Sequence, residues 1–293
     1  EPCCHHGRTP PCVQAIIRAG IQRVIVALKD PDPRMSGSGI ADLQYAGITV
    51  ICGVLEEEAS FQNRHYIFRL KTGRPWGVLK WAMSLDGRIA LPNGESKWIS
   101  TDHSRKWVHR LRAESDAVIV GGGTVRQDNP LLTTRGLVSP EPLRIVFSRN
   151  LGFENNLNLW NTEIAKTFIA YGPAAKASAE SLELPEGPEL MPLKESEPTS
   201  LMESLAKKGC NSVLWECGSS LAALAIQQNC VQELAVIVSP KLLGGVPSKT
   251  PLSDFGFTSV NQAIVLKEWS AHKIDKDLLI KASPLVINSD FVA

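Results

Sequence analysis

The sequence predicts an α/β protein with two domains. Three observations lead to this fold class. Helix and strand signals alternate along the first seventy or so residues, apolar strands and helices alternate again from Trp76, and the breaker Gly73–Pro75 separates the two series. A length of 293 residues also suits one large or two ordinary domains. We therefore expect a first domain over residues 1–72 and a second over residues 73–293.

In the first domain, helix and strand signals follow one another in order. Two segments have apolar residues at helical spacing and end in glycine, and each precedes a short apolar run typical of a buried strand. This order predicts parallel strands, with a last helix before the boundary. The expected helices are 13–20, 40–47 and 56–72, and the expected strands are 22–28 and 48–55.

The second domain begins with the apolar strand 76–84, followed by two turn dipeptides, Asp86-Gly87 and Asn93-Gly94, of the kind that connect hairpins. Ser100 or Thr101 caps the helix that follows. The segment 174–200 has weak signals, and we expect a variable surface there. The other expected helices are 200–209 and 218–229, and the other expected strands are 116–121, 143–149, 166–172, 211–217 and 231–239.

Composition and charge exclude several classes of protein. Hydrophobic residues make up 43% of the chain and charged residues 21%, which is typical of a globular protein with real cores. A net charge of +1 without a long basic run argues against a nucleic-acid partner. No apolar stretch approaches the ~20 residues of a membrane span. Seven cysteines are too few for a disulfide framework, so we expect a reducing, cytoplasmic location.

The opening stretch EPCCHHGRTPPC has the residue types of a zinc site. Thiolates suit zinc, and zinc-dependent nucleobase deaminases take two ligands from a P-C…C segment. Cys3 and Cys12 would be those ligands, although eight residues separate them instead of the usual two. Cys12 also begins a helix, which favours its thiolate. From spacing alone, two reduced thiols in a loop remain an equal alternative. We interpret Cys4 as a bystander, and His5 and His6 as substrate-side or solvent residues.

Six segments resemble those of a known family and follow one another in the same order. The similarity is to the bifunctional riboflavin-biosynthesis deaminase–reductases, and it covers essentially the whole chain. Several of the segments are specific to that family. They are EPCCHHGRTPPC, KDPDPRMSGSGIADLQYAGI, GRPWGVLKWAMSLDGRIA, GESKWIS, RAESDAVIVGGGTVRQDNPLLTTR and WECGSSLA…PKLLGG.

The resemblance implies the C-terminal part of a cytidine-deaminase-like αβα domain, followed by a dihydrofolate-reductase-like α/β domain. In the family, an H-A-E segment upstream of E-P-C supplies the third ligand of the Zn²⁺ and the proton-shuttling glutamate. This sequence begins at Glu1, inside the motif, and contains neither. We therefore expect an N-terminally truncated deaminase half that lacks its catalytic glutamate.

The resemblance also implies an NADPH-dependent reductase that converts the ribosyl group of 5-amino-6-(5-phosphoribosylamino)uracil, a pyrimidine ribosylamine phosphate, to ribityl. Arginine suits the phosphate because its guanidinium binds it bidentately. By composition alone, Arg112 would belong to a solvated basic helix face with Arg105, Lys106 and Arg110. The substrate-binding residues that the resemblance implies are Ser96, Arg112, Leu132, Arg135 and Glu216, with Lys80 facing the base or the phosphate.

For the cofactor, the turn between Glu216 and the following helix leaves free N–H groups at a helix N-terminus, which suit a pyrophosphate. The glycine run Gly121–Gly123 does not fit G-x-G-x-x-G, so we do not predict a Rossmann domain. Trp98 could instead be a core aromatic residue, and Asp128 an ordinary turn residue. The implied cofactor residues are Ala82, Trp98, Thr124, Asp128, Gly218, Ser219, Ser220, Leu221, Ala222, Ala223 and Leu224.

Two other functions stay open at this point. The chain could be a catalytically dead homologue that acts as a binding or scaffold module, or a dihydrofolate-reductase relative with another substrate. The complete set of reductase motifs argues against the first, and the preceding cysteine segment argues against the second. We further expect a homodimer formed through the reductase domain.

Overall fold

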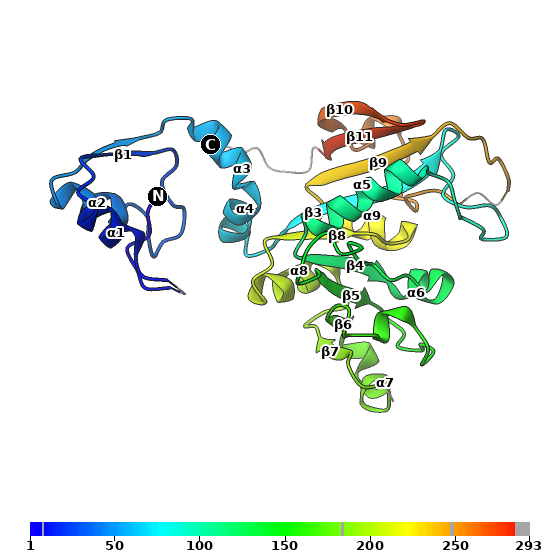
Figure 1. Cartoon of the computed structure of the whole chain (residues 1–293). Helices are drawn as coiled ribbons and strands as arrows, with labels where there is room; N and C mark the ends of the chain where they lie inside the picture. The colour runs from blue at the N-terminus through cyan, green and yellow to red at the C-terminus, as the bar shows by residue number, and fades with distance from the viewer. Residues whose placement is uncertain (8, 183–184, 247–248, 285–293) are drawn as a thin grey trace. The chain divides into compact units, whose positions relative to one another are not determined.

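The computed structural model describes residues 1–7, 9–182, 185–246 and 249–284 of the chain (Figure 1). The chain divides into two compact units, Glu1–Gly73 and Arg74–Ala293. Gly73 has φ +70° and ends the last helix of the first unit in the left-handed region, where glycine is unstrained. Each unit is described by itself.

The first unit is a small α/β layer. Its elements are α1 (Cys12–Arg18), β1 (Arg23–Val26), α2 (Ser38–Tyr45), β2 (Thr49–Cys52), α3 (Glu56–Gln62) and α4 (Arg64–Thr72). β1 and β2 pair in parallel, and Val13, Leu43 and Ile48 form the buried core beside them. The single helix expected over residues 56–72 is divided at Asn63 into α3 and α4.

The second unit is built around one large sheet. Its strands are β3 (Trp76–Ser84), β4 (Ala117–Gly121), β5 (Leu143–Phe147), β6 (Thr167–Tyr171), β7 (Glu189–Pro192), β8 (Ser212–Trp215), β9 (Glu233–Ser239), β10 (Leu266–Ile274) and β11 (Asp277–Pro284). Its α-helices are α5 (Asp102–Ala113), α6 (Gly122–Asp128), α7 (Lys176–Glu180), α8 (Pro198–Lys207) and α9 (Ser219–Gln227). In the described part of the chain, no helix is long and apolar enough to cross a bilayer.

The strand order is β10-β11-β9-β3-β8-β4-β5-β6-β7. Neighbouring strands are parallel from β9 to β7, and β10 and β11 add an antiparallel hairpin at one edge. In the parallel part the carboxyl ends of the strands lie along one edge, which is where open α/β sheets usually bind ligands.

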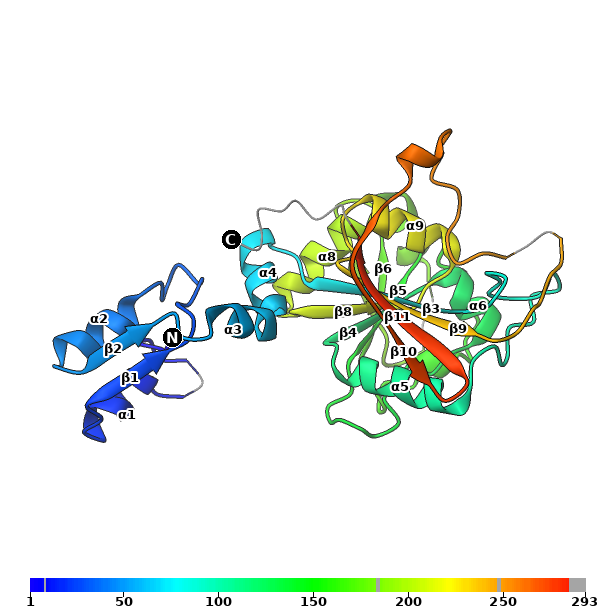
Figure 2. The same cartoon turned by 90° about the horizontal axis from the view of Figure 1, so that it is seen from above.

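Both faces of the sheet are apolar because helices cover both. Alternate residues of β4 point to opposite faces, so Ile119 belongs to one core and Val118 to the other. α8 and α9 cover the first face, and α5 and α6 cover the second. Figure 2 shows α8 and α9 on one side of the sheet and α5 on the opposite side.

Three details differ from the sequence-based expectations. Asp86-Gly87 and Asn93-Gly94 form turns, but among the described residues the segment between them forms an isolated bridge, from Ala90 to Lys249, and no hairpin. The segment 174–200, expected to be surface, contains α7 and the edge strand β7. The hairpin β10–β11 was not expected.

Candidate active site

A pocket of about 650 Å³ opens in the second unit, a size that suits a small-molecule ligand. Its walls come from β3, from α5, from the segment 96–100 and from the loop between α6 and β5. Eight residues predicted from the sequence line it, and they are Lys80, Ala82, Ser96, Trp98, Arg112, Asp128, Leu132 and Arg135.

A cluster of three charged side chains lies against this pocket. Glu216, which follows β8, accepts two hydrogen bonds from Arg112 of α5, from Nε to Oε1 at 2.5 Å and from Nη2 to Oε2 at 3.1 Å. Lys80 of β3 lies 3.8 Å from the same carboxylate. The three side chains are only 12–17% exposed. Arg112 is therefore not part of a solvated helix face, and its guanidinium is largely occupied by Glu216.

The charges in this cluster control one another's protonation. Burial raises the pKa of Glu216, but Arg112 and Lys80 outweigh it and hold the pKa at about 2. Burial lowers the pKa of Lys80, and Glu216 opposes that effect. At neutral pH the site thus contains an ionised carboxylate held between two basic side chains.

The loop that carries Leu132 and Arg135 is held by a carboxylate. Glu141 accepts hydrogen bonds from N and Oγ1 of Thr134, both at 2.7 Å, and from N of Gly136 at 3.4 Å. Leu132 and Arg135 have φ values of +52° and +60°, a costly conformation for such residues that the surrounding bonds must maintain. Arg135 is exposed and has no hydrogen bond or ion pair with any other described residue. Its guanidinium is therefore available to an anion.

Trp98 forms an open wall of the pocket. Its side chain is 63% exposed, so the alternative of a core aromatic residue is wrong. The guanidinium of Arg105 lies 4.2 Å from the ring centroid, in a cation–π contact, and Nζ of Lys241 donates to the Trp98 carbonyl at 2.7 Å. Arg105 thus packs against the ring and Lys241 holds the backbone of Trp98, at a place where a flat group could stack on the ring.

Two strand-to-helix junctions lie next to each other at the carboxyl edge of the sheet. Gly218 is the N-cap of α9 and has no side chain, so no described residue caps this helix through its side chain. A Cβ placed on Gly218 would lie 3.7 Å from Oγ1 of Thr124, and one placed on Gly121 would lie 3.5 Å from Cδ2 of Leu221. The start of α9 and the start of α6 therefore form one surface rich in free backbone N–H groups, suited to phosphates.

The structure thus separates the predicted residues into two groups within the second unit. The pocket group contains the eight residues named above, with Glu216 behind them. The second group, at the two helix starts, contains Thr124 and the segment Gly218–Leu224, and these residues do not line the pocket.

Sequence reasoning missed His109, which also lines the pocket. It lies on α5 one turn from Arg112 and from Arg105, because the numbers 105, 109 and 112 follow the i, i+4, i+7 pattern of a single helix face. Its Nδ1 lies 3.1 Å from the carbonyl oxygen of Thr133. The helical spacing is the signal that could have identified it.

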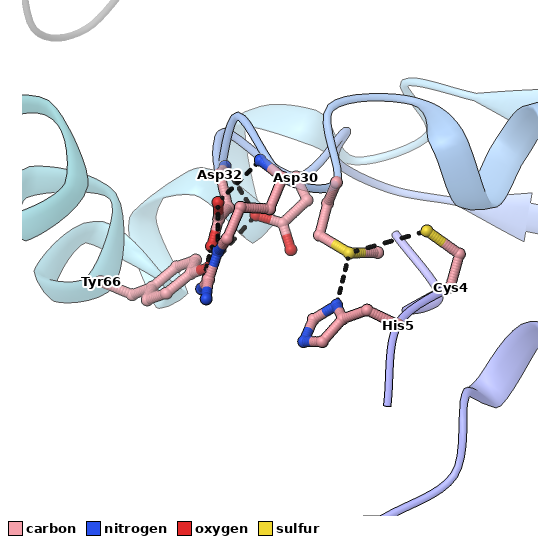
Figure 3. Close-up of polar contacts among 7 residues, drawn as sticks. Cys4, His5, Asp30, Asp32 and Tyr66 are labelled. Atoms are coloured by element: carbon pink, nitrogen blue, oxygen red, sulfur yellow. Dashed lines mark hydrogen bonds and ion pairs between the residues drawn. The ribbon is translucent and has the colours of Figure 1, made fainter. Parts of the chain in front are cut away.

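Cys3 and Cys12 are brought together in the first unit. The backbone N–H of Cys12, at the start of α1, donates to Sγ of Cys3 at 3.3 Å, and hydrogen bonds from Cys12 lower the pKa of the Cys3 thiol. Cys4 and His5 point to Sδ of Met35, at 3.9 Å and 2.9 Å (Figure 3). Among the described residues, no group of three or more His, Cys, Asp or Glu side chains could hold a metal ion. The donor set does not fit the three protein ligands of a catalytic zinc.

We expect this chain to bind zinc weakly, because two thiolates leave half of a tetrahedral shell to water. Metal analysis of protein purified without added metal should give well under one zinc per chain. A Cys3→Ser variant should change that value little, whereas stoichiometric zinc that disappears in this variant would contradict the expectation.

Comparison with known proteins gives consistent matches over this chain. Residues 75–280 match the family model described as the RibD C-terminal domain. The chain is 43% identical over 283 residues to the riboflavin biosynthesis protein RibD of Synechocystis sp., covering 95% of this chain and 76% of that protein.

Two solved structures superpose on nearly the whole chain. RibD of Acinetobacter baumannii, form 1, gives a TM-score of 0.85 at 32% identity and covers 97% of this chain and 79% of its own. A diaminohydroxyphosphoribosylaminopyrimidine deaminase/5-amino-6-(5-phosphoribosylamino)uracil reductase of Thermotoga maritima gives 0.84 at 32% identity, covering 97% and 77%. The α/β fold class expected from the sequence is confirmed.

Proposed function

This chain belongs to the RibD family of riboflavin-biosynthesis proteins and carries its reductase, and from that premise we propose that it reduces the ribosyl group of 5-amino-6-(5-phosphoribosylamino)uracil to ribityl with NADPH. The observation that carries this proposal is the buried Lys80–Glu216–Arg112 cluster beside a pocket of about 650 Å³. Arg135, which has no partner among the described residues, also lines this pocket. A sugar phosphate has both the hydroxyl groups and the dianion that such a pocket would bind.

For the substrate, we assign the phosphate to Arg135, whose guanidinium has no other partner among the described residues. Ser96 and Leu132 would contact the rest of the molecule in the pocket. Lys80 carries a donor and Glu216 an acceptor, and they would hold the sugar hydroxyls near the reacting carbon. Arg112 holds Glu216 by two hydrogen bonds, and Glu216 pairs with Lys80. Arg112 itself is a positioning residue in this arrangement, because most of its donors are occupied.

For the cofactor, NADPH when bound supplies the hydride. The residues that fit its pyrophosphate are at the start of α9, from Gly218 to Leu224, with Thr124 of the neighbouring junction. Trp98, Ala82 and Asp128 line the side of the pocket on which we place the nicotinamide part. The two groups of predicted residues would thus be connected by one extended ligand.

We propose that the first unit is part of a zinc deaminase domain. Its described residues are incomplete for catalysis, because they bring together two thiols and no third metal ligand. A cytoplasmic location and a homodimer through the second unit are further proposals. A catalytically dead binding module is the alternative function, and the following measurement distinguishes it from the reductase.

Replacing Arg135 with Ala should raise the KM for the pyrimidine ribosylamine phosphate by a factor of roughly 30–150. Loss of a charged hydrogen-bonding partner costs on the order of 2–3 kcal/mol. The KM for NADPH should change little. Oxidation of NADPH, followed by absorbance with the purified full chain, measures both constants.

The matched control is Arg110→Ala, since Arg110 is an exposed arginine of α5 that does not line the pocket. Equal increases of both KM values in Arg135→Ala would remove Arg135 from the phosphate role. Absence of any NADPH oxidation by the folded wild-type chain would favour the dead module.

A further inference from the structure

The side chain of His109 lines the pocket, and its Nδ1 lies 3.1 Å from the carbonyl oxygen of Thr133. A carbonyl oxygen only accepts hydrogen bonds, so this contact is a hydrogen bond when the ring hydrogen is on Nδ1. Nη1 of Arg112, which can only donate, lies 3.4 Å from the same Nδ1, but it already donates to the Thr133 carbonyl at the shorter distance of 2.9 Å. We therefore assign the Nδ1–H tautomer to His109 on the shorter of its two contacts.

The opposite ring nitrogen, Nε2, has no hydrogen-bond partner among the described residues, although His109 lines the pocket. In the neutral ring Nε2 carries a lone pair and can only accept. Protonation converts it into a donor and makes the ring a cation.

The surroundings of His109 favour its neutral form. The charged groups of this pocket come from several elements. They are Asp102, Arg105 and Arg112 on α5, Lys97 before α5, Lys80 on β3, Glu216 after β8, Asp128 at the end of α6, and Arg135 in the loop. Burial and the charges of Arg112 and Arg135 lower the pKa of His109, while the Thr133 carbonyl and Glu216 oppose them. A phosphate dianion bound beside Arg135 would reverse the sign of the local charge.

We propose that His109 is a proton-linked ligand of the substrate's phosphate: it takes a proton from solvent at Nε2 when the phosphate binds, and donates a hydrogen bond to it. Arg135 is charged with or without the phosphate in this subsite, whereas His109 becomes charged when the phosphate binds. This inference rests on the proposed function, because it requires a phosphorylated substrate in this pocket.

The consequence is a pH dependence of phosphate binding. A group whose pKa is higher in the complex than in the free protein favours binding at low pH, and this contribution is lost as pH rises through the pKa of the complex. A phosphate monoester loses its second proton near pH 6, so above pH 7 its own titration adds little.

The experiment uses ribose 5-phosphate as the probe and the full chain. The dissociation constant for the wild type should rise about tenfold between pH 7 and 8.5, since one proton per binding event gives at most a factor of ten per pH unit. Calorimetry at pH 7.5 in buffers of different ionisation enthalpy should show net proton uptake. Both effects should disappear in His109→Asn, which keeps an amide donor for Thr133 but has no titrating group.

A second measurement does not depend on the variant. In the wild type, the NMR titration of the His109 ring should move to higher pH when ribose 5-phosphate is present. An unmoved titration, or the same proton uptake in the wild type and in His109→Asn, would overturn the role of His109 alone. Failure of the wild type to bind ribose 5-phosphate, with ribose as the unphosphorylated comparison, would instead overturn the proposed function.

Discussion

Glu216→Ala should lower the free energy of unfolding by about 3–5 kcal/mol and abolish reduction. The substitution leaves Arg112 and Lys80, which are 14% and 17% exposed, as buried cations without their carboxylate. Breaking a buried ion pair by removing one partner costs that much because the remaining charge is neither solvated nor paired. Chemical denaturation of the purified chain measures the loss.

The matched control for this substitution is Glu180→Ala. Glu180 also forms an ion pair with a lysine, Lys176, at 3.9 Å. Both side chains are exposed, Glu180 to 68% and Lys176 to 74%. An exposed pair at i, i+4 contributes about 0.3–0.5 kcal/mol. Similar losses of stability in the two variants would show that the buried ion pairs of Glu216 stabilise the fold no more than an exposed pair does.

The ionisation of Glu216 also predicts that the free energy of unfolding decreases in acid. The pKa of Glu216 is held at about 2 in the folded chain, below its ordinary value of 4.5. A lowered pKa means that the contribution of Glu216 to stability is complete above pH 4.5 and is lost as the pH falls toward 2. In Glu216→Ala this part of the acid unfolding curve should flatten.

Arg144→Met should also lower the free energy of unfolding by about 3–5 kcal/mol. Arg144 is fully buried on β5, and burial lowers its pKa to about 10. Its Nη2 donates to the carbonyl oxygens of Leu159 at 3.0 Å, Asn161 at 2.7 Å and Ala165 at 2.7 Å. Methionine fills much of the volume but donates nothing. The Leu159 carbonyl keeps the hydrogen bond from Oγ1 of Thr167 at 2.7 Å, but the carbonyls of Asn161 and Ala165 lose the Arg144 donor, at about 1–3 kcal/mol each.

Arg149→Met is the control for Arg144→Met, because Arg149 is an exposed arginine just beyond the same strand. Its effect should stay within about 0.5 kcal/mol. If Arg144→Met unfolds at the same denaturant concentration as the control, the carbonyls find other donors and the assignment of a bridging role to Arg144 is wrong.

The central strands and α5 could be predicted because their signals are local. The run 116–121 is mostly apolar and leads into glycines, which predicts β4. Thr101 has a residue type that favours helix N-caps, and in the structure it caps α5 by accepting a hydrogen bond from N of Ser104. β7 and β10 gave weaker signals. β7 has four residues and ends in proline, and β10 is an edge strand with mostly exposed side chains, so neither has the apolar run of a buried strand.

The site was predictable only in part for a related reason. The family resemblance named Arg112 and Glu216 separately, but their ion pair joins residues 104 positions apart, and no local pattern encodes such a contact. The same holds for Arg144, whose position inside an apolar strand is visible in the sequence while its carbonyl partners are not. His109 differs from these, since the helical spacing from Arg105 and Arg112 was available and was not used.

The strand order has a consequence for the sequence of events during synthesis. β4, β5, β6 and β7 pair in the order in which they are made, so this half of the sheet can assemble as it emerges. β3 is made before them, yet Trp76 pairs with Ser212 and Val78 with Glu233, near the end of the chain. The strand that carries Lys80 must therefore wait unpaired, with apolar side chains exposed, until β8 and β9 appear. Such long-range parallel pairing makes folding slow, and this interval is when the nascent chain has the greatest need of a chaperone.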